Sequence, residues 1–141
     1  MKTKILELLK GMNSDSKKES YKCEKELCKI LTDVCNKLES IEDMTKMYME
    51  GYPDKIEEID MDNTYKGIKK LPEIIWCNYG TFEFETSWLD IDLKSYFEEL
   101  KEKSITHKQN TIEKVEASLN KHKEELEALK NLKYENLDIE R

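Results

Sequence analysis

The sequence predicts an α+β fold that is mostly α, with a helical N-terminal part, a small central β-hairpin or short antiparallel sheet, and a long C-terminal helix with coiled-coil character. Three observations predict it. Apolar residues recur at helical spacing towards both ends, two short alternating segments flank a glycine-containing turn in the middle, and charged residues make up 39% of the 141 residues. So high a charged fraction is typical of exposed helices. We therefore expect one domain, residues 1–141, with long solvated helices.

Residues 1–50 are the predicted helical part. The apolar residues near the N-terminus indicate a short amphipathic helix, which we expect to end at Gly11 because glycine tolerates positive φ. A second helical pattern runs from about residue 16 to residue 49. A sequence resembling a capping box begins at Ser40 and favours a break there.

The cysteines predict a reducing compartment. They form no CxxC pair and no zinc spacing, and Cys28 and Cys35 are two helical turns apart among apolar residues. We expect buried free thiols of a cytoplasmic protein, with pairing in a secreted chain as the alternative. No apolar run approaches the length of a membrane span. We expect no membrane association.

The central region, residues 51–92, holds the predicted hairpin. Residues 74–77 and 81–86 read as two strands joined by a short turn that contains Gly80. Alternation along the second strand separates two kinds of side chain, with Phe82 and Phe84 on one face and Glu83 and Glu85 on the other. We therefore expect one buried face and one acidic face.

The C-terminal part, residues 93–133, is predicted to be a helix capped by Asp90 or Asp92, followed by a tail at 134–141. Its heptad seam has six apolar residues at nine positions, with Lys108, His122 and Lys133 as the polar ones. The partner of this seam is either a second copy or the helix of residues 20–49. The predicted oligomerisation residues are Ile105, Ile112, Val115, Leu119, His122, Leu126 and Leu129.

The negative charge is concentrated in one block. Residues 50–100 hold 13 acidic residues against 5 lysines, a balance of −8 in a chain whose net charge is −7. Both tryptophans and all three phenylalanines lie in the same block. We interpret it as an interaction surface. The predicted partner-binding residues are Glu57, Glu58, Asp60, Asp62, Trp76, Tyr79, Glu83, Glu85, Trp88, Asp90 and Asp92.

The basic residues disfavour direct nucleic-acid binding. They are 23 lysines and a single arginine, Arg141, and lysine lacks the planar fork with which arginine grips phosphates and guanine edges. No phosphate loop, nucleophile arrangement or cofactor motif is present in the sequence. We expect a protein that is not an enzyme and needs no cofactor or metal.

These features lead to a functional hypothesis. An acidic surface with aromatic anchors suits a protein partner with a basic groove, such as a nucleic-acid enzyme. In size and charge the chain resembles phage and mobile-element inhibitors of host nucleases, including anti-CRISPR proteins, although no family motif is matched. The hypothesis is therefore a non-enzymatic inhibitor of the anti-defence type.

Two alternatives belong to other functional classes. The C-terminal helix could make the protein a coiled-coil scaffold, adaptor or chaperone, whose acidic block only keeps it soluble. Asp54 after a proline, with Asp92 and Lys94 downstream, has the skeleton of a metal-dependent nuclease pattern. A calcium-loop opening at Asp60, Asp62 and Thr64 lacks the glycine and glutamate that such a loop requires.

Overall fold

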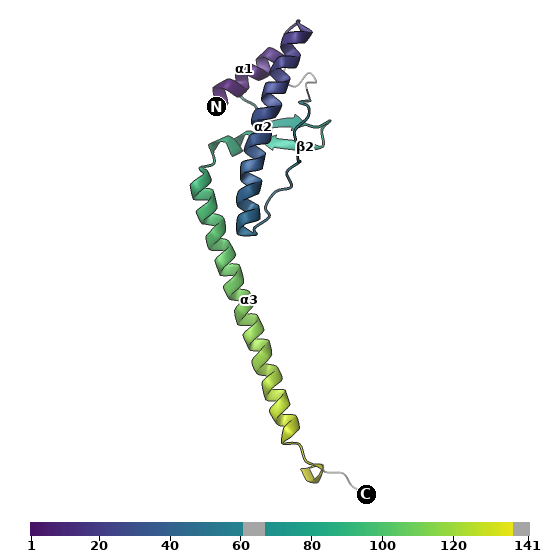
Figure 1. Cartoon of the computed structure of the whole chain (residues 1–141), viewed down its shortest axis with the longest axis vertical. Coiled ribbons are helices and arrows are strands. Elements are labelled where there is room, and N and C mark those ends of the chain that lie inside the picture. Colours follow the sequence, from purple (N-terminus) through teal and green to yellow (C-terminus); the bar gives the residue numbers. More distant parts are fainter. Residues whose placement is uncertain (61–66, 137–141) are drawn as a thin grey trace. The chain divides into compact units, whose positions relative to one another are not determined.

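The computed structural model describes residues 1–60 and 67–136. It confirms an α+β fold that is mostly α, with a two-stranded antiparallel sheet and a long C-terminal helix, whereas coiled-coil character stays a prediction. Internal contacts divide the chain into two units, Met1–Lys101 and Glu102–Arg141, so the single domain also stays a prediction. The elements in order are α1 (Lys2–Met12), α2 (Lys17–Thr45), β1 (Ile74–Cys77), β2 (Phe82–Glu85), η2 (Thr86–Asp90), α3 (Leu93–Lys130) and η3 (Tyr134–Asn136), as Figure 1 shows.

Helix α1 packs along the first turns of α2 (Figure 1). It ends at Met12, so the prediction that Gly11 terminates the helix is wrong. A Cβ atom at Gly11 would lie 2.4 Å from the Cys23 Sγ atom of α2. The glycine therefore permits the close approach of the two helices rather than a C-terminal cap.

Helix α2 is continuous from Lys17 to Thr45. Its N-terminal cap is Ser16, whose Oγ atom accepts a hydrogen bond from the Glu19 backbone N–H at 3.3 Å. The predicted break at Ser40 is absent, because that hydroxyl donates to the Asn36 carbonyl at 2.8 Å within the helix. The helix ends four residues before the predicted residue 49, with Lys46 in the left-handed region at φ 60°.

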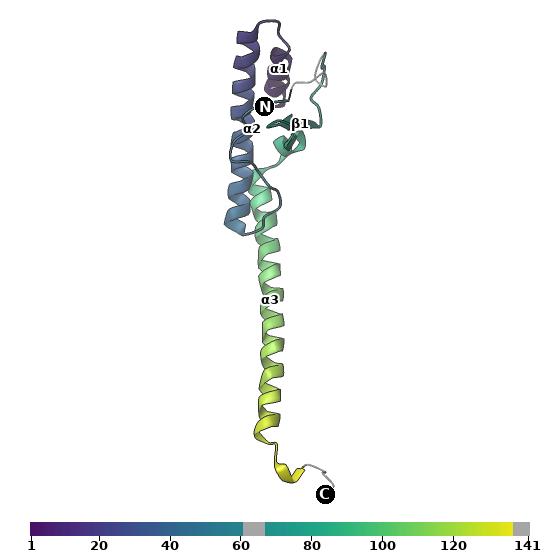
Figure 2. The same cartoon turned by 90° about the vertical axis from the view of Figure 1, so that its right-hand side faces the viewer.

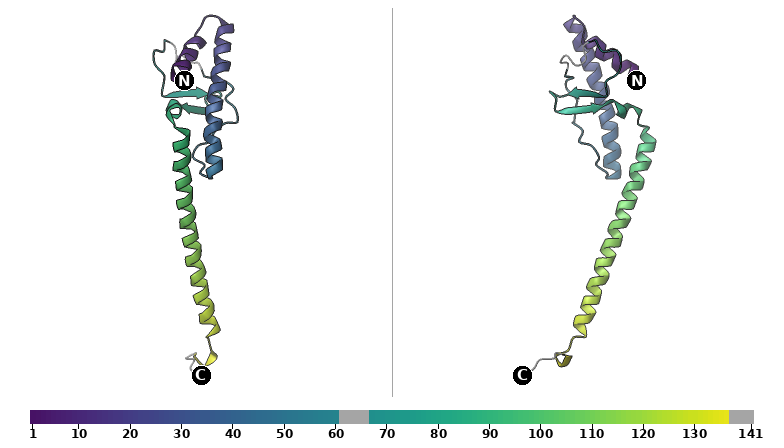
Figure 3. Two further views of the ribbon diagram at one scale, coloured as in Figure 1. Left: turned by 60° about the vertical axis from the view of Figure 1, so that its left-hand side comes forward. Right: turned by 180° about the vertical axis from the view of Figure 1, so that it is seen from behind.

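The hairpin matches the sequence prediction in position and alternation. Register pairs Ile75 with Phe84 and Trp76 with Glu83. The side chains of Ile75 and Phe84 are fully buried in the cluster that α1 and α2 line. In Figure 2 and in the left view of Figure 3 the hairpin and α1 lie on the same side of α2, so α2 closes the inner face of the sheet.

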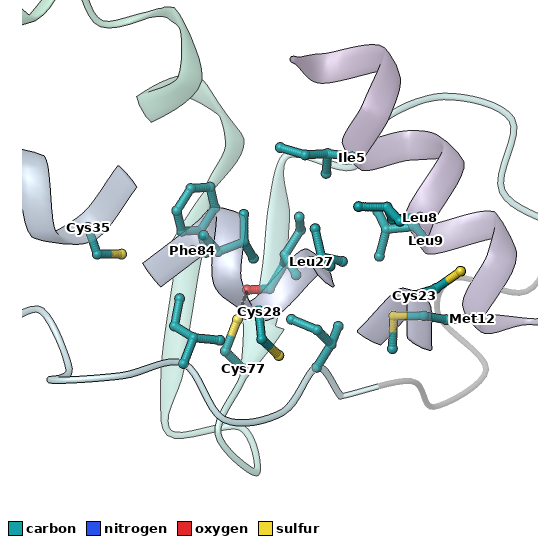
Figure 4. Packing of buried hydrophobic residues seen from close by; sticks show 14 of the residues in the cluster. Ile5, Leu8, Leu9, Met12, Cys23, Leu27, Cys28, Cys35, Cys77 and Phe84 are labelled. Atoms are coloured by element: carbon teal, nitrogen blue, oxygen red, sulfur yellow. Dashed lines mark hydrogen bonds between the residues drawn. The ribbon is translucent and has the colours of Figure 1, made fainter. Parts of the chain in front are cut away.

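The core joins side chains from both N-terminal helices and from the hairpin (Figure 4). All four cysteines are free and buried, which confirms the prediction for Cys28 and Cys35. Burial raises the pKa of the Cys28 thiol to about 11 and that of Cys35 to about 12. Cys77 donates its Sγ–H to the Ile75 carbonyl at 3.5 Å. These thiols therefore stay protonated at neutral pH and act as small core residues.

Helix α3 begins at Leu93 and ends at Lys130, close to the predicted range 93–133. Leu100 is its buried residue, and Tyr96 and Phe97 are half-buried. Leu93, the first residue of the helix, is 38% exposed. Beyond the helix the predicted tail contains the short η3 turn, and residues 137–141 lie outside the described part. Among residues 1–60 and 67–136, no helix combines the length and apolar composition needed to cross a bilayer.

Candidate binding surface

The hairpin gains a neighbour that the sequence analysis missed. Residues 55–60, which lie outside the two predicted strands, run along the other edge of β1 and form an isolated antiparallel bridge between Ile59 and Cys77. The Asp60 N–H donates to the Trp76 carbonyl at 2.9 Å, and the Asn78 N–H donates to the Glu58 carbonyl at 3.0 Å. Strand β1 therefore lies between β2 and this segment.

Asn78 fixes the segment to the hairpin turn. Its side-chain carbonyl accepts a hydrogen bond from the Glu57 N–H at 2.7 Å, and its amide group donates to the Lys55 carbonyl at 3.1 Å. Next to it, the Glu58 carboxylate accepts a hydrogen bond from the Tyr79 N–H at 2.9 Å. The turn and the segment thus hold each other through side-chain to backbone bonds, which orders an exposed loop.

Strand geometry gathers acidic side chains on one face. Because Ile59 and Cys77 point into the core, their neighbours Glu58, Asp60 and Trp76 project from the opposite face. Glu83 lies directly across from Trp76 in the sheet, and Glu85 lies across from Ile74. We call Glu58, Asp60, Trp76, Glu83 and Glu85 the acidic face.

Burial and neighbouring carboxylates both act on the acidic side chains of this region. Burial, a hydrogen bond that the protonated Glu58 carboxyl donates to Asp60, and the Asp60 charge raise the pKa of Glu58 above its usual range. Burial and the charges of Glu85 and Glu42 raise the pKa of Glu50 in the same way. In the described chain no ion pair neutralises the carboxylates of the acidic face. The negative charge is therefore open to an external cation.

Two further predicted residues lie near the acidic face without belonging to it. Tyr79 occupies the hairpin turn, where its side chain is 82% exposed and its φ is 58°. Glu57 instead lines a groove of about 1110 Å³ between α2 and residues 54–57. That groove mixes lysines with carboxylates, so it lacks the single sign of charge that the acidic face has.

Trp88 was predicted to belong to the partner-binding surface, and the structure places it in the core instead. Its side chain is 9% exposed, and its ring contacts Phe84 at 5.0 Å and Tyr52 at 5.5 Å between centroids, both edge to face. The η2 turn carries the residue back over the hairpin and into the core. Trp88 therefore stabilises the sheet and is not available to a partner.

The other predicted aspartates have roles within the chain. Asp90 pairs with Lys2 at 2.6 Å between Oδ2 and Nζ. Asp92 caps α3, because its carboxylate accepts hydrogen bonds from the Lys94 N–H and the Ser95 hydroxyl, both at 3.1 Å. The predicted Asp62 lies outside the described residues, as does most of the calcium-loop pattern that includes it.

The carboxylates proposed for metal chemistry have other surroundings. Asp54 lines the groove beside α2, whereas Asp92 is the α3 cap. Within residues 1–60 and 67–136, no group of three or more histidine, cysteine or carboxylate side chains is arranged to hold a metal ion. The geometry gives the hydrolase alternative no supporting observation.

Glu42 is a structural carboxylate that sequence reasoning missed. It is 1% exposed and accepts hydrogen bonds from the Met49 N–H at 2.8 Å, the Glu50 N–H at 3.0 Å and the Tyr96 hydroxyl at 3.0 Å. Burial and the hydrogen bond to Glu42 raise the pKa of Tyr96 to about 12, and the same two causes raise the pKa of Tyr52. Glu42 therefore ties the loop after α2 to the first turns of α3.

The predicted oligomerisation residues all lie on α3. The six apolar ones are between 40% and 66% exposed, and His122 is exposed with its Nδ1 atom 3.6 Å from the Glu125 carboxylate.

Comparisons of the chain with protein families, with curated proteins and with solved structures found no match. Functional inference therefore depends on the surfaces of this chain alone.

Proposed function

We propose that the protein is a non-enzymatic binding protein that docks its acidic face on the basic surface of a partner protein. The observation that carries this proposal is the grouping of four carboxylates with Trp76 on the outer face of a sheet whose inner face is anchored in the core. The anchoring fixes the spacing of the charges. A fixed negative field speeds encounter with a cationic groove and selects its register.

Tyr79 supports a docking role for this end of the hairpin. A bulky residue in the left-handed region costs roughly 1–2 kcal/mol relative to glycine, yet its ring is 82% exposed and gains little packing in return. Exposed aromatic residues beside charged ones are the usual anchors of protein interfaces. Tyr79 therefore suits an anchor at the rim of the acidic face.

The partner we propose is a nucleic-acid enzyme. Its basic groove normally binds phosphates, and carboxylates at fixed spacing offer the same sign of charge. On this proposal the protein is a cytoplasmic inhibitor, in keeping with the resemblance in size and charge to phage and mobile-element inhibitors. The lysine-rich composition and the single arginine fit a partner that is a protein rather than a nucleic acid.

The proposal is tested by capture from a bacterial lysate on the immobilised chain at low and high salt. We expect a nucleic-acid enzyme to be captured at low salt, to be lost at high salt, and to be released by added duplex DNA. The double variant Glu83→Lys with Glu85→Lys should abolish capture, because it changes the charge of the acidic face by four units.

A matched control carries the same change of charge elsewhere. Glu113→Lys with Glu124→Lys alters two exposed carboxylates of α3 and leaves the acidic face intact. Equal capture by both double variants, or capture that DNA does not displace, would contradict the proposal.

A further inference from the structure

The apolar seam of α3 offers a second interaction surface, independent of the acidic face. Its residues repeat at the a and d positions of heptads between Ile105 and Leu129, and each of the six apolar side chains is at least 40% exposed. Helix α2 also has an apolar stripe, but its Leu27, Leu31 and Leu38 are already buried in the core. In the described chain nothing packs on the seam of α3, and a second copy of the chain presents the same uncovered seam.

Charge complementarity decides how two copies of the seam can pair. In a parallel pair, equivalent residues face each other, so Lys108 would meet Lys108 of the second copy at a d position, and His122 would meet His122. Like charges in a buried layer are costly. An antiparallel pair instead brings a positions opposite d positions, which separates both polar residues from their equivalents.

One antiparallel register forms apolar layers and also places opposite charges beside each other. With Leu119 opposite His122 of the second copy, Val115 faces Leu126 and Ile112 faces Leu129, which gives apolar layers on both sides of the centre. The flanking e positions then place Glu116 beside Lys123 of the second copy, and the two-fold symmetry makes this contact twice.

Neighbouring registers lack this match. A shift of one heptad in one direction brings Glu116 against its own equivalent, and a shift in the other direction brings Lys123 against its own equivalent. The first shift leaves no attractive e contact, and the second pairs Glu116 with Lys130 of the second copy but also sets Glu125 against its own equivalent at the g position. The matched register alone combines attractive e contacts with no like-charge pair at the two-fold axis. The matched register pairs residues 111–130 and leaves Ile105 outside the interface.

We propose that the exposed seam of α3 binds a second copy of the chain as an antiparallel coiled coil, with Glu116 of each copy facing Lys123 of the other. The interface lies wholly within the second unit of the chain. The charges at the e positions specify the relative orientation of the two helices, and the four apolar layers hold the helices together.

Charge swaps test the register. Glu116→Lys and Lys123→Glu each turn two attractive contacts into two repulsive ones, so each should raise the dissociation constant of the dimer about tenfold in sedimentation equilibrium. The double variant restores opposite charges and should return the constant to the wild-type value. Both residue types are good helix formers, and circular dichroism checks that helix content is unchanged.

A matched swap distinguishes the parallel arrangement. In a parallel pair the attractive contact is Glu125 with Lys130 of the second copy, whereas in the antiparallel register Glu125 faces Ser118 and Lys130 faces Gln109. Glu125→Lys should therefore leave the dissociation constant within about twofold. A tenfold loss in this variant, with no effect of Glu116→Lys, would overturn the proposal in favour of parallel pairing.

Spin labels measure the orientation directly. A label on His107→Cys, an exposed position outside the seam, would lie about 40 Å from its equivalent along an antiparallel pair and within about 20 Å in a parallel one. The native cysteines are buried, so they do not compete for the label. A distance within about 20 Å, or a chain that stays monomeric up to millimolar concentration, overturns the inference.

Discussion

Helices α2 and α3 have the same kind of apolar stripe and opposite surroundings. Along the 29 residues of α2, eight are buried, among them Leu27, Leu31 and Leu38. Along the 38 residues of α3, Leu100 is the buried one. Helical periodicity therefore reveals which side of a helix is apolar, but it does not reveal what covers that side. The covering partner has to be found in tertiary contacts or in another chain.

The largest expected effect comes from pH, because four ionisable thiols lie in the core around α2 and none lies in α3. The pKa values of Cys28 and Cys35 are raised by burial from 9.0 to about 11 and about 12, and that of Cys77 is raised as well. The unfolded chain thus releases these protons at lower pH than the folded chain. Stability is full below pH 9 and falls as the pH rises towards 12, on the order of 1 kcal/mol per thiol per pH unit.

Urea unfolding followed by circular dichroism from pH 8 to pH 11 measures this loss. A Cys35→Ala variant should show a shallower fall with pH, whatever its stability at pH 8, because one of the four buried thiols is gone. An unchanged slope would show that Cys35 is not protected in the folded state.

Matched leucine truncations test the comparison of the two helices directly. Leu31→Ala removes a fully buried side chain from α2 and should lower the free energy of unfolding by about 2–5 kcal/mol. Leu119→Ala removes a side chain that is 51% exposed, so in dilute monomer it should change that energy by less than about 0.5 kcal/mol. Urea unfolding at low protein concentration gives both values. Equal losses in the two variants would refute the contrast between the helices.

Removing a buried carboxylate from α2 and an exposed one from α3 tests the same contrast between the two helices. Glu42→Ala leaves the N–H groups of Met49 and Glu50 and the Tyr96 hydroxyl without their acceptor, at a cost of about 1–3 kcal/mol. Glu113→Ala in α3 removes an exposed side chain and should stay within about 0.5 kcal/mol of the wild type. Thermal unfolding of the two variants measures the difference. A Glu42→Ala protein as stable as the wild type would mean that these groups find other partners.

The smallest effect concerns Tyr79, an exposed aromatic residue of the first unit, Met1–Lys101. Tyr79→Gly relieves a left-handed conformation and should raise the free energy of unfolding by about 1 kcal/mol. If Tyr79 is an anchor, the same variant should reduce partner capture. Lower stability in this variant would show that the Tyr79 ring makes a net packing contribution despite its exposure.

Sequence patterns predicted the local parts of this structure well. The alternation from Phe82 to Glu85 predicted the two faces of β2, and Asp92 was recognisable as a residue that caps a helix. Each of these signals depends on a few neighbouring residues. Helix and strand periods therefore carry the information directly.

Tertiary contacts explain what the sequence did not show. Residues 55–60 look like a polar loop, and they become a neighbour of β1 only through the side chain of Asn78 and the bridge at Ile59. Trp88 reads as a surface aromatic in an acidic block, but the η2 turn brings it against Phe84. Of the predicted surface, Glu83 and Glu85 lie on one face as strand alternation predicts. Glu58 and Asp60, which were argued from charge alone, join that face only through the contacts of residues 55–60 with β1.

The segment at residues 55–60 also bears on self-association of the sheet. By occupying one side of β1, it removes a row of backbone groups that could otherwise pair with another molecule. In the described part of the sheet the remaining open edge is that of β2, which is only four residues long and alternates glutamate with phenylalanine. Short charged edges resist amyloid-like stacking. The glutamates proposed to recruit a partner are therefore also the residues that keep concentrated protein from aggregating through its strands.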